Sequence, residues 1–179
     1  AEVVAEQDQP LKVRIGLASV ILTMEGDDNM VKQTAGSIMD KKEFDKVNVF
    51  GLGEPNNAYA QYFIGQSYLN PLTDPKKTNV FLANVTFEPG CRNNWHIHHA
   101  KSGGGQLLIC TAGSGWYQEI GKDAVSLEPG TVITIPANVK HWHGAKKDSW
   151  FSHIAIEVPG ENTSNEWCEP VTDEEYDKL

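Results

Sequence analysis

The chain has few of the features that mark several large classes of proteins. Its 179 residues include three cysteines, Cys91, Cys110 and Cys168, which are widely spaced and form no Cys-x-x-Cys pair. An odd number of isolated cysteines is typical of reduced thiols. We therefore expect no disulfide framework in this protein.

The sequence also lacks a long apolar run and a basic stripe. The longest apolar stretch, residues 15–24, is interrupted and shorter than the roughly 20 residues that span a bilayer. Acidic residues outnumber basic residues by 24 to 15, which gives a net charge of −9 and disfavours nucleic acid or an anionic membrane as a partner. No signal-peptide pattern is present, although the chain opens on Ala1. The expected location is the cytoplasm, with a removed leader as the alternative.

Residues 1–48 differ in pattern from the rest of the chain. Apolar residues alternate from Leu11 to Leu17, as in a strand. Asp27 or Asp28 can cap a helix that runs to about Lys42. This segment is too small to close a core alone. We expect residues 1–48 to form an extension that packs on the main domain or on a dimer partner, and residues 49–179 to form that domain.

Short strands dominate from residue 49 onward. Apolar and aromatic runs bounded by turn residues predict strands at 59–72, 79–87, 106–112, 115–120, 124–127, 132–135, 141–145 and 151–158. So many short strands predict an all-β sandwich or barrel. Thr172 is followed three residues later by Glu175, a capping box that predicts a short C-terminal helix.

Two histidine clusters carry the chemistry. Successive side chains of a strand point to opposite faces, so His96 and His98 project together, while Ile97 points the other way. The same argument places His141 and His143 on one face of a second strand. If these strands pair, three or four imidazoles meet at one point, which is enough to hold a divalent metal ion.

Similar turns introduce the two clusters. Glu88-Pro89-Gly90 and Glu128-Pro129-Gly130 both predict tight turns with glycine at positive φ. The first spacing resembles the first motif of the cupin superfamily, matched by Gly90, His96, His98, Gln106 and Gly113. The second resembles the second cupin motif, matched by Gly130, Pro136 and His141, with Asn138 in the place of a glycine. Asparagine also tolerates positive φ. The resemblance implies a cupin (double-stranded β-helix, jelly-roll) barrel.

The first motif departs from the cupin pattern at two points. Residues 99–105 form a longer loop than usual, with three consecutive glycines, and we expect residues 101–105 to be a mobile flap at the barrel mouth. Gln106 stands where the family has glutamate. Its carbonyl oxygen can still bind a metal ion, but it brings no charge. The resemblance therefore implies a divalent ion (manganese, iron, nickel or zinc) held by His96, His98, Gln106 and His141, at a site that attracts anions.

Residues outside the ligand set narrow the resemblance to one group of cupins. Residues 85–90, 95–96, 141–144 and 171–176 are similar to the small single-domain cupins grouped with carboxymuconolactone decarboxylase-type proteins, which include cupin-type hydroxynitrile lyases. In those lyases the equivalents of Ala83, Val85, His143, His153 and Glu157 surround the metal-bound ligand. The resemblance implies catalytic roles for His143 as acid/base, His153 and Glu157, although second-shell support or a structural carboxylate fits the same positions.

These observations predict a metal-dependent enzyme that acts on a small, anionic or chelating organic molecule. Lyase- or decarboxylase-like Lewis-acid chemistry with a histidine acid/base is the first expectation. A dioxygenase, an isomerase and a non-catalytic small-molecule-binding cupin are the alternatives. We also expect a homodimer, because the outward-facing residues Leu107, Ile109, Ile154 and Ile156 are apolar, unless residues 1–48 cover them.

Overall fold

The computed structural model describes residues 39–179, and this part of the chain is a two-layered β structure with short helices at its ends. The elements, in chain order, are α1 (Lys41–Val47), β1 (Glu54–Pro55), the 3₁₀ helix η1 (Asn57–Tyr62), β2 (Phe63–Ile64), β3 (Ser67–Pro71), β4 (Phe81–Phe87), β5 (Arg92–Asn93), β6 (His96–His99), β7 (Ser102–Gly103), β8 (Gln106–Gly113), β9 (Gly115–Glu119), β10 (Val125–Leu127), β11 (Val132–Ile135), β12 (Lys140–Ala145), β13 (Phe151–Glu157), β14 (Gly160–Glu161), β15 (Ser164–Trp167) and α2 (Asp173–Tyr176).

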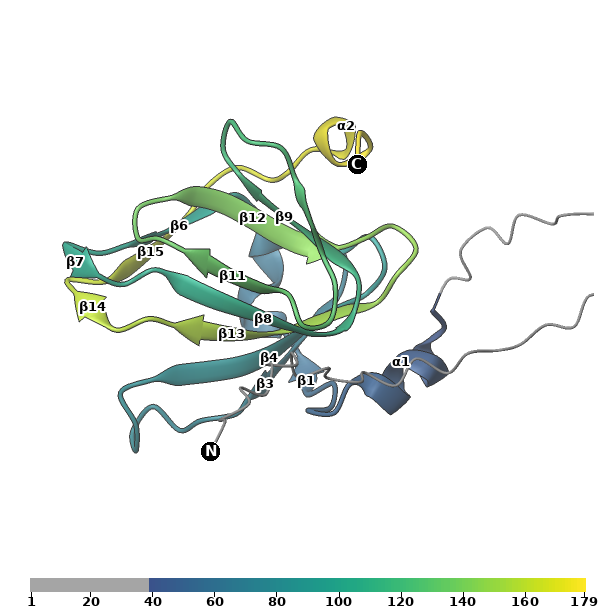
Figure 1. Ribbon diagram of the computed structural model, residues 1–179, viewed down its shortest axis with the longest axis horizontal. Helices are drawn as coiled ribbons and strands as arrows, with labels where there is room; N and C mark the ends of the chain where they lie inside the picture. Colours follow the sequence, from purple (N-terminus) through teal and green to yellow (C-terminus); the bar gives the residue numbers. More distant parts are fainter. Residues whose placement is uncertain (1–38) are drawn as a thin grey trace, which may run out of the picture. The chain divides into compact units, whose positions relative to one another are not determined.

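Two antiparallel sheets form the barrel. One has the strand order β1-β3-β4-β13-β8-β11; the other has the order β10-β9-β12-β5-β2, with β6 paired to both β12 and β15. Figure 1 shows β6, β9, β12 and β15 on one side and β4, β8 and β13 on the other. Inward-facing side chains such as Phe87, Leu108 and Phe151 are fully buried between the layers. The predicted all-β cupin barrel with a short C-terminal helix is confirmed.

The predicted turns also form. The Cys91 and Thr131 backbone N–H groups donate to the carbonyls of Glu88 and Glu128, each at 2.9 Å. Gly90 has a φ of 77° and Gly130 a φ of 92°, values that L side chains rarely adopt. Asn138, in the place of the motif glycine, has a φ of 67°, as expected of a residue that tolerates this conformation.

One predicted strand is partly wrong. Residues 57–62 belong to the 3₁₀ helix η1 and not to a strand that begins at residue 59. In a 3₁₀ helix, side chains three residues apart lie on one side, and Tyr59 and Tyr62 accordingly both contact Trp167, at ring-centroid distances of 6.4 and 4.6 Å. The aromatic residues that suggested a strand therefore lie on one side of a short 3₁₀ helix.

The predicted helix end near Lys42 is also wrong. Asp40 accepts a hydrogen bond from the Glu43 backbone N–H, and a helix begins after it and continues to Val47. Residues 39 and 40 are not helical, so α1 is a separate helix, and its Phe44 is fully buried and stacks on Trp150 at 5.5 Å. The strand expected at Leu11–Leu17 and the helix cap at Asp27 or Asp28 lie outside the described residues.

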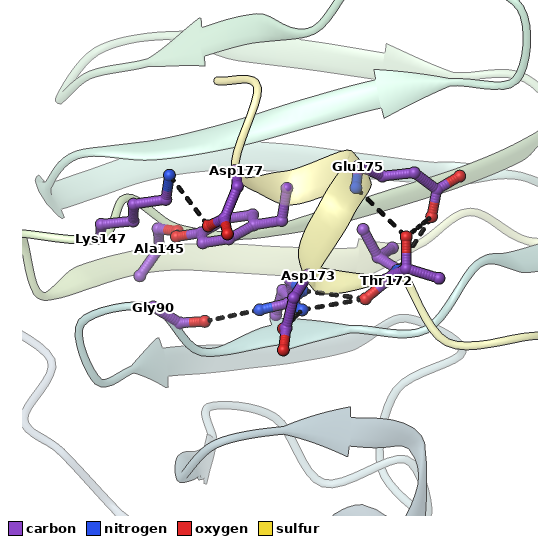
Figure 2. Close-up of polar contacts among 10 residues, drawn as sticks. Gly90, Ala145, Lys147, Thr172, Asp173, Glu175 and Asp177 are labelled. Atoms are coloured by element: carbon purple, nitrogen blue, oxygen red, sulfur yellow. Dashed lines mark hydrogen bonds and ion pairs between the residues drawn. The ribbon is translucent and has the colours of Figure 1, made fainter.

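A buried arginine fastens the C-terminal segment to the barrel (Figure 2). Arg92 of β5 donates from Nε and Nη2 to the Val171 carbonyl, at 3.1 and 3.0 Å, and also pairs with the Asp173 carboxylate. Its guanidinium lies 4.4 Å from the ring centroid of Tyr176, whose hydroxyl donates to the Ala145 carbonyl at 2.7 Å. We call Arg92, Val171, Asp173 and Tyr176 the C-terminal latch. The capping box between Thr172 and Glu175 is present as predicted.

The outer face of β8 and β13 is half-buried at its apolar residues, Leu107, Ile109, Ile154 and Ile156. The homodimer that these residues suggested stays a prediction. Within residues 39–179, no helix has the length and apolar character needed to cross a membrane.

Candidate metal centre

Strand pairing brings three histidines to one point. In the register between β6 and β12, His96 lies directly opposite His141, and opposite residues of an antiparallel pair are each other's nearest neighbours. The rings of His96 and His141 have centroids 4.2 Å apart, and His98 completes the group. One ligand atom from each of the three lies within 4.8 Å of the others. All three residues are buried, with no more than 6% of their surface exposed.

The contacts of each ring orient its ligand atom. Nδ1 of His96 lies 2.9 Å from the Asn94 carbonyl oxygen, and Nδ1 of His98 lies 2.9 Å from Asn165 Oδ1. Nδ1 of His141 lies 2.9 Å from the Val139 carbonyl oxygen. Since these oxygens only accept, each Nδ1 carries the proton and each Nε2 keeps its lone pair. The Nε2 atoms of His98 and His141 are buried and have no hydrogen-bond partner among residues 39–179. Unpaired lone pairs of this kind are expected where a metal ion binds.

Gln106 adds a fourth group from the opposite sheet. Its Nε2 donates to Glu157 Oε1 at 2.9 Å, and its own Oε1 is buried without a hydrogen-bond partner. The unpaired carbonyl oxygen and the unpaired imidazole nitrogens form a donor set of nitrogen and oxygen atoms, which suits a divalent first-row metal. The residues present therefore fit the ion that the sequence motifs predicted, with Gln106 as a ligand remaining a prediction.

Burial keeps His96 and His141 neutral. Burial lowers the pKa of His96 well below its usual value, and the nearby imidazoles of His141 and His98 lower it further. Burial also lowers the pKa of His141 to about 4. Neutral imidazole is the form that binds a metal ion, so His96 and His141 are in the binding form at neutral pH.

A cavity of about 370 Å³ opens on His96, His98 and Gln106 and is also lined by His143, His153 and Glu157. His143 lies outside the three-histidine cluster, with its ring centroid 6.1 Å from that of His141. Its Nδ1 is 3.2 Å from His153 Nε2, so one of the two imidazoles donates to the other. Burial lowers the pKa of both: His143 well below its usual value and His153 to about 4. Two neutral, hydrogen-bonded imidazoles therefore face the space beside the cluster.

Asn93 holds the His143 ring in place. Its Oδ1 accepts from the His143 backbone N–H at 3.0 Å, which turns its Nδ2 toward the ring, 3.1 Å from Nε2. The same Nδ2 lies 3.3 Å from Nδ1 of the ring, so it contacts both ring nitrogens. Asn93 was missed by sequence reasoning, although it lies three residues before His96.

Comparison with known proteins agrees with this architecture. Residues 83–156 match the family described as "Cupin domain". Over 118 residues, the chain is 41% identical to (R)-mandelonitrile lyase of Granulicella tundricola, covering 65% of this chain and 87% of that protein. The chain belongs to the cupin family. The crystal structure of a cupin-like protein from Thermotoga maritima is 39% identical, with a TM-score of 0.65 over 73% of this chain and 96% of that one. A cupin 2 conserved barrel domain protein from Rhodopseudomonas palustris, 13% identical with a TM-score of 0.53 over 70% of this chain and 81% of that one, shares the fold alone.

One wall of the cupin cavity is aromatic and comes from segments that sequence reasoning did not assign to the site. Trp167 of β15 stacks on Tyr62 with a ring-centroid distance of 4.6 Å and lies 4.8 Å from the ring of His96. Tyr59 and Phe63 line the cavity beside it. β15 reaches this position because it pairs with β6, placing Trp167 opposite His96. The only sequence signal was an isolated tryptophan in a polar segment.

The tryptophans next to the ligands in sequence have a different role. Trp95 and Trp142 point away from the cavity and pack with Val171 and Tyr176 in a separate apolar cluster. Cys91 and Cys110 are buried in the main core, and the metal-binding cluster of the described residues contains no thiol. Trp95, Trp142, Cys91 and Cys110 are therefore structural residues of the apolar clusters.

The glycine-rich loop before Gln106 is held in place by the fold. Ser102–Gly103 pairs with Gly160–Glu161, and Lys101 forms an ion pair with Glu161 at 2.7 Å. Gly105 has a φ of 88°, and a Cβ there would lie 2.3 Å from the Ile135 carbonyl oxygen. The glycines that suggested an unrestrained flap are thus required by backbone shape and close contact. The mobile flap itself stays a prediction.

Proposed function

We propose that this cupin is a metal-dependent lyase that cleaves a small organic molecule, with His143 as the acid/base. The observation that carries the proposal is that His96 and His98 of the three-histidine cluster border the same cavity as the His143–His153 pair. The similarity to a protein named (R)-mandelonitrile lyase supports the reaction class. A cyanohydrin such as mandelonitrile is therefore the first substrate to test.

His96, His98, His141 and Gln106 would hold the ion through the atoms that lack partners within the described residues. When bound, the ion supplies a positive charge that stabilises an anionic oxygen or a cyanide leaving group. Its identity among manganese, iron, nickel and zinc is open to elemental analysis, since nitrogen and oxygen ligands suit all four.

The protein's own part in the reaction is proton transfer. His143 takes the proton of the substrate hydroxyl, and the O–H electron pair forms the carbonyl double bond. The bond to the nitrile carbon breaks, its electron pair leaves with cyanide, and the proton from His143 converts cyanide into hydrogen cyanide. His153 shares a hydrogen bond with His143 at 3.2 Å and stabilises the charged ring. The products are an aldehyde and hydrogen cyanide.

The cavity walls support an aromatic substituent on the substrate. Trp167, Tyr59 and Phe63 form one wall, and Ala83, Val85 and Ala155 keep the opposite surface small and apolar. Aromatic rings favour offset stacking and edge contacts with one another.

Two substitutions test the roles of neighbouring histidines on β12. His141→Ala should lose both metal and turnover of (R)-mandelonitrile, because it removes a ligand atom. His143→Ala should keep the metal and lower kcat by about 10²–10⁴-fold, the usual contribution of a general acid/base. Elemental analysis and aldehyde formation measure the two effects. His99→Ala is the matched control, since this exposed histidine contacts Asn138 and Glu166 outside the cavity.

Two results would contradict the proposal. Equal metal loss in both variants would make His143 a ligand or a support instead of a base. Metal-replete wild-type protein that cleaves no member of an aromatic and aliphatic cyanohydrin panel would remove the lyase assignment, and oxygen consumption with an organic substrate would favour the dioxygenase alternative.

A further inference from the structure

Glu157 contacts two of the proposed metal ligands at once. It lies on β13 directly opposite Gln106 on β8. Its Oε1 accepts from Gln106 Nε2 at 2.9 Å, and its Oε2 lies 3.2 Å from His98 Nδ1. Each oxygen of this carboxylate thus contacts one proposed ligand, and the second polar atom of that ligand, Gln106 Oε1 or His98 Nε2, remains for the metal ion.

We propose that Glu157 is a positioning residue for the metal centre: it fixes the amide orientation of Gln106 and the tautomer of His98, and it places a negative charge one hydrogen bond beyond the ligands. This inference rests on the proposed metal centre. It assigns Glu157 a role different from the catalytic one that the family resemblance implied.

The argument for Gln106 follows from donors and acceptors. An ionised carboxylate only accepts hydrogen bonds, so the amide must turn its NH₂ group toward Glu157. The carbonyl oxygen then points the other way, and Gln106 Oε1 is indeed buried without a partner. If the carboxylate were absent, the amide could rotate and present its NH₂ group to the cation, which repels it.

The argument for His98 is parallel. Its Nδ1 faces two acceptors, Asn165 Oδ1 at 2.9 Å and Glu157 Oε2 at 3.2 Å. Nδ1 therefore carries the proton, and the unpaired, buried Nε2 keeps its lone pair for a metal ion. Carboxylates that orient a metal-binding histidine in this way raise its basicity.

The charge of Glu157 also changes the expected character of the site. The sequence suggested three neutral imidazoles and a neutral amide, with the double charge of the ion left uncompensated. In the structure a carboxylate is hydrogen-bonded to the amide that replaces the usual glutamate ligand. The negative charge is thus retained in contact with the ligands, at the cavity wall.

The experiment titrates metal-free protein with Co²⁺, following heat by calorimetry and the ligand field by visible absorption. Glu157→Gln can satisfy Gln106 or His98 but not both, because its NH₂ group cannot accept. We expect about 10-fold weaker Co²⁺ binding and a shifted absorption band. Glu157→Ala should weaken binding by about 10–100-fold, the usual effect of losing an outer contact to a metal ligand.

An exchanged pair gives the sharpest test. In the double variant Q106E/E157Q, the new amide can donate to the new carboxylate and accept from His98. Both contacts are thus restored, and only the hydrogen bond between positions 106 and 157 has its polarity reversed. The double variant should therefore bind Co²⁺ at least 10-fold more tightly than the two single changes predict when added. Glu161→Gln, which changes an exposed glutamate paired with Lys101, is the control and should bind as wild type.

The possible failures are distinguishable. Wild-type protein that binds no Co²⁺ would remove the proposed metal centre itself. Wild-type protein that binds Co²⁺ while Glu157→Gln binds it equally well, with the same spectrum, would overturn only the role of Glu157. Strict additivity of the two single changes would overturn it as well, since independent effects imply no shared contact.

Discussion

The barrel contains two buried polar clusters that differ in one respect. In the C-terminal latch, the Arg92 guanidinium finds acceptors in Val171 and Asp173, and the Tyr176 hydroxyl finds one in Ala145 (Figure 2). In the cavity, four buried atoms of the site lack partners: His98 Nε2, Gln106 Oε1, His141 Nε2 and His153 Nδ1. A satisfied network stabilises the fold by itself, whereas unsatisfied atoms cost free energy until a ligand pairs with them.

The largest expected difference between the two clusters is in how acid changes the free energy of unfolding. The pKa values of His141 and His153 are lowered by burial to about 4, below the value of about 6.5 in the unfolded chain. The unfolded state therefore binds more protons between these two pKa values. The stability that depends on neutral histidines is fully present above pH 6.5 and is lost as the pH falls toward 4. Each histidine should cost about 3 kcal/mol at pH 4.

Urea unfolding of metal-free protein between pH 7 and pH 4 measures this loss. His153→Gln should remove about 3 kcal/mol of it, because it removes one of the four buried histidines whose pKa is lowered. Arg92 keeps its charge throughout this range, so the latch should not contribute. A pH profile identical in wild type and His153→Gln would contradict the assignment of a buried neutral imidazole.

Substitution of Arg92 should break the latch. Arg92→Met leaves the carbonyl of the fully buried Val171 without its hydrogen-bond donor. It also removes the cation from the Tyr176 ring. The expected loss in the free energy of unfolding is about 3 kcal/mol, from one unsatisfied carbonyl and one cation–π contact. Asp173→Asn is the matched control. Its side chain is 85% exposed, so it should cost less than about 1 kcal/mol; equal losses in the two variants would place the stability in the ion pair instead.

Metal binding should stabilise the cavity and leave the latch unchanged. At a free metal concentration 100 times the Kd, the free energy of unfolding should rise by about 2.7 kcal/mol. His141→Ala should lose this increment, while Arg92→Met should keep it, because distant sites act additively. Denaturation with and without metal provides the measurement. A metal-dependent increment that disappears in Arg92→Met would show that the two clusters are coupled.

The smallest effect concerns the cap that begins α2. Thr172 Oγ1 accepts from the Glu175 backbone N–H at 3.2 Å, and Glu175 Oε2 accepts from the Thr172 backbone N–H at 2.9 Å. Thr172→Ala should cost about 1 kcal/mol, or a fall of about 2–4 °C in Tm for a chain of this size. Thr172→Ser should behave as wild type in the same thermal scan. A full-sized loss in the serine variant would point to methyl packing instead of the cap.

Local patterns predicted much of the site. The parity of His96 and His98 depends only on the period of a strand, and the Glu-Pro-Gly turns depend on the backbone preferences of proline and glycine. The family resemblance placed His153 and Glu157 around the ligand, and both residues line the cavity. The Thr172 capping box also involves residues close in sequence.

Contacts between distant segments were not predictable in this way. Asn165 and Trp167 reach His98 and His96 only because β15 pairs with β6, and nothing within residues 164–167 specifies that partner. The position of Glu157 opposite Gln106 depends on the register between β13 and β8, which shifts between Ser152 and His153. A register shift changes which side chains face each other.

The sequence by itself therefore determined the identity of the three histidines, the turns that precede them and the face of the strand on which each lies, since these follow from backbone geometry over a few residues. Only the tertiary structure determined which rings meet, which polar atoms are left without partners and which carboxylate supports the ligands. Those properties depend on strand pairing and burial, and both arise from packing between residues far apart in the chain.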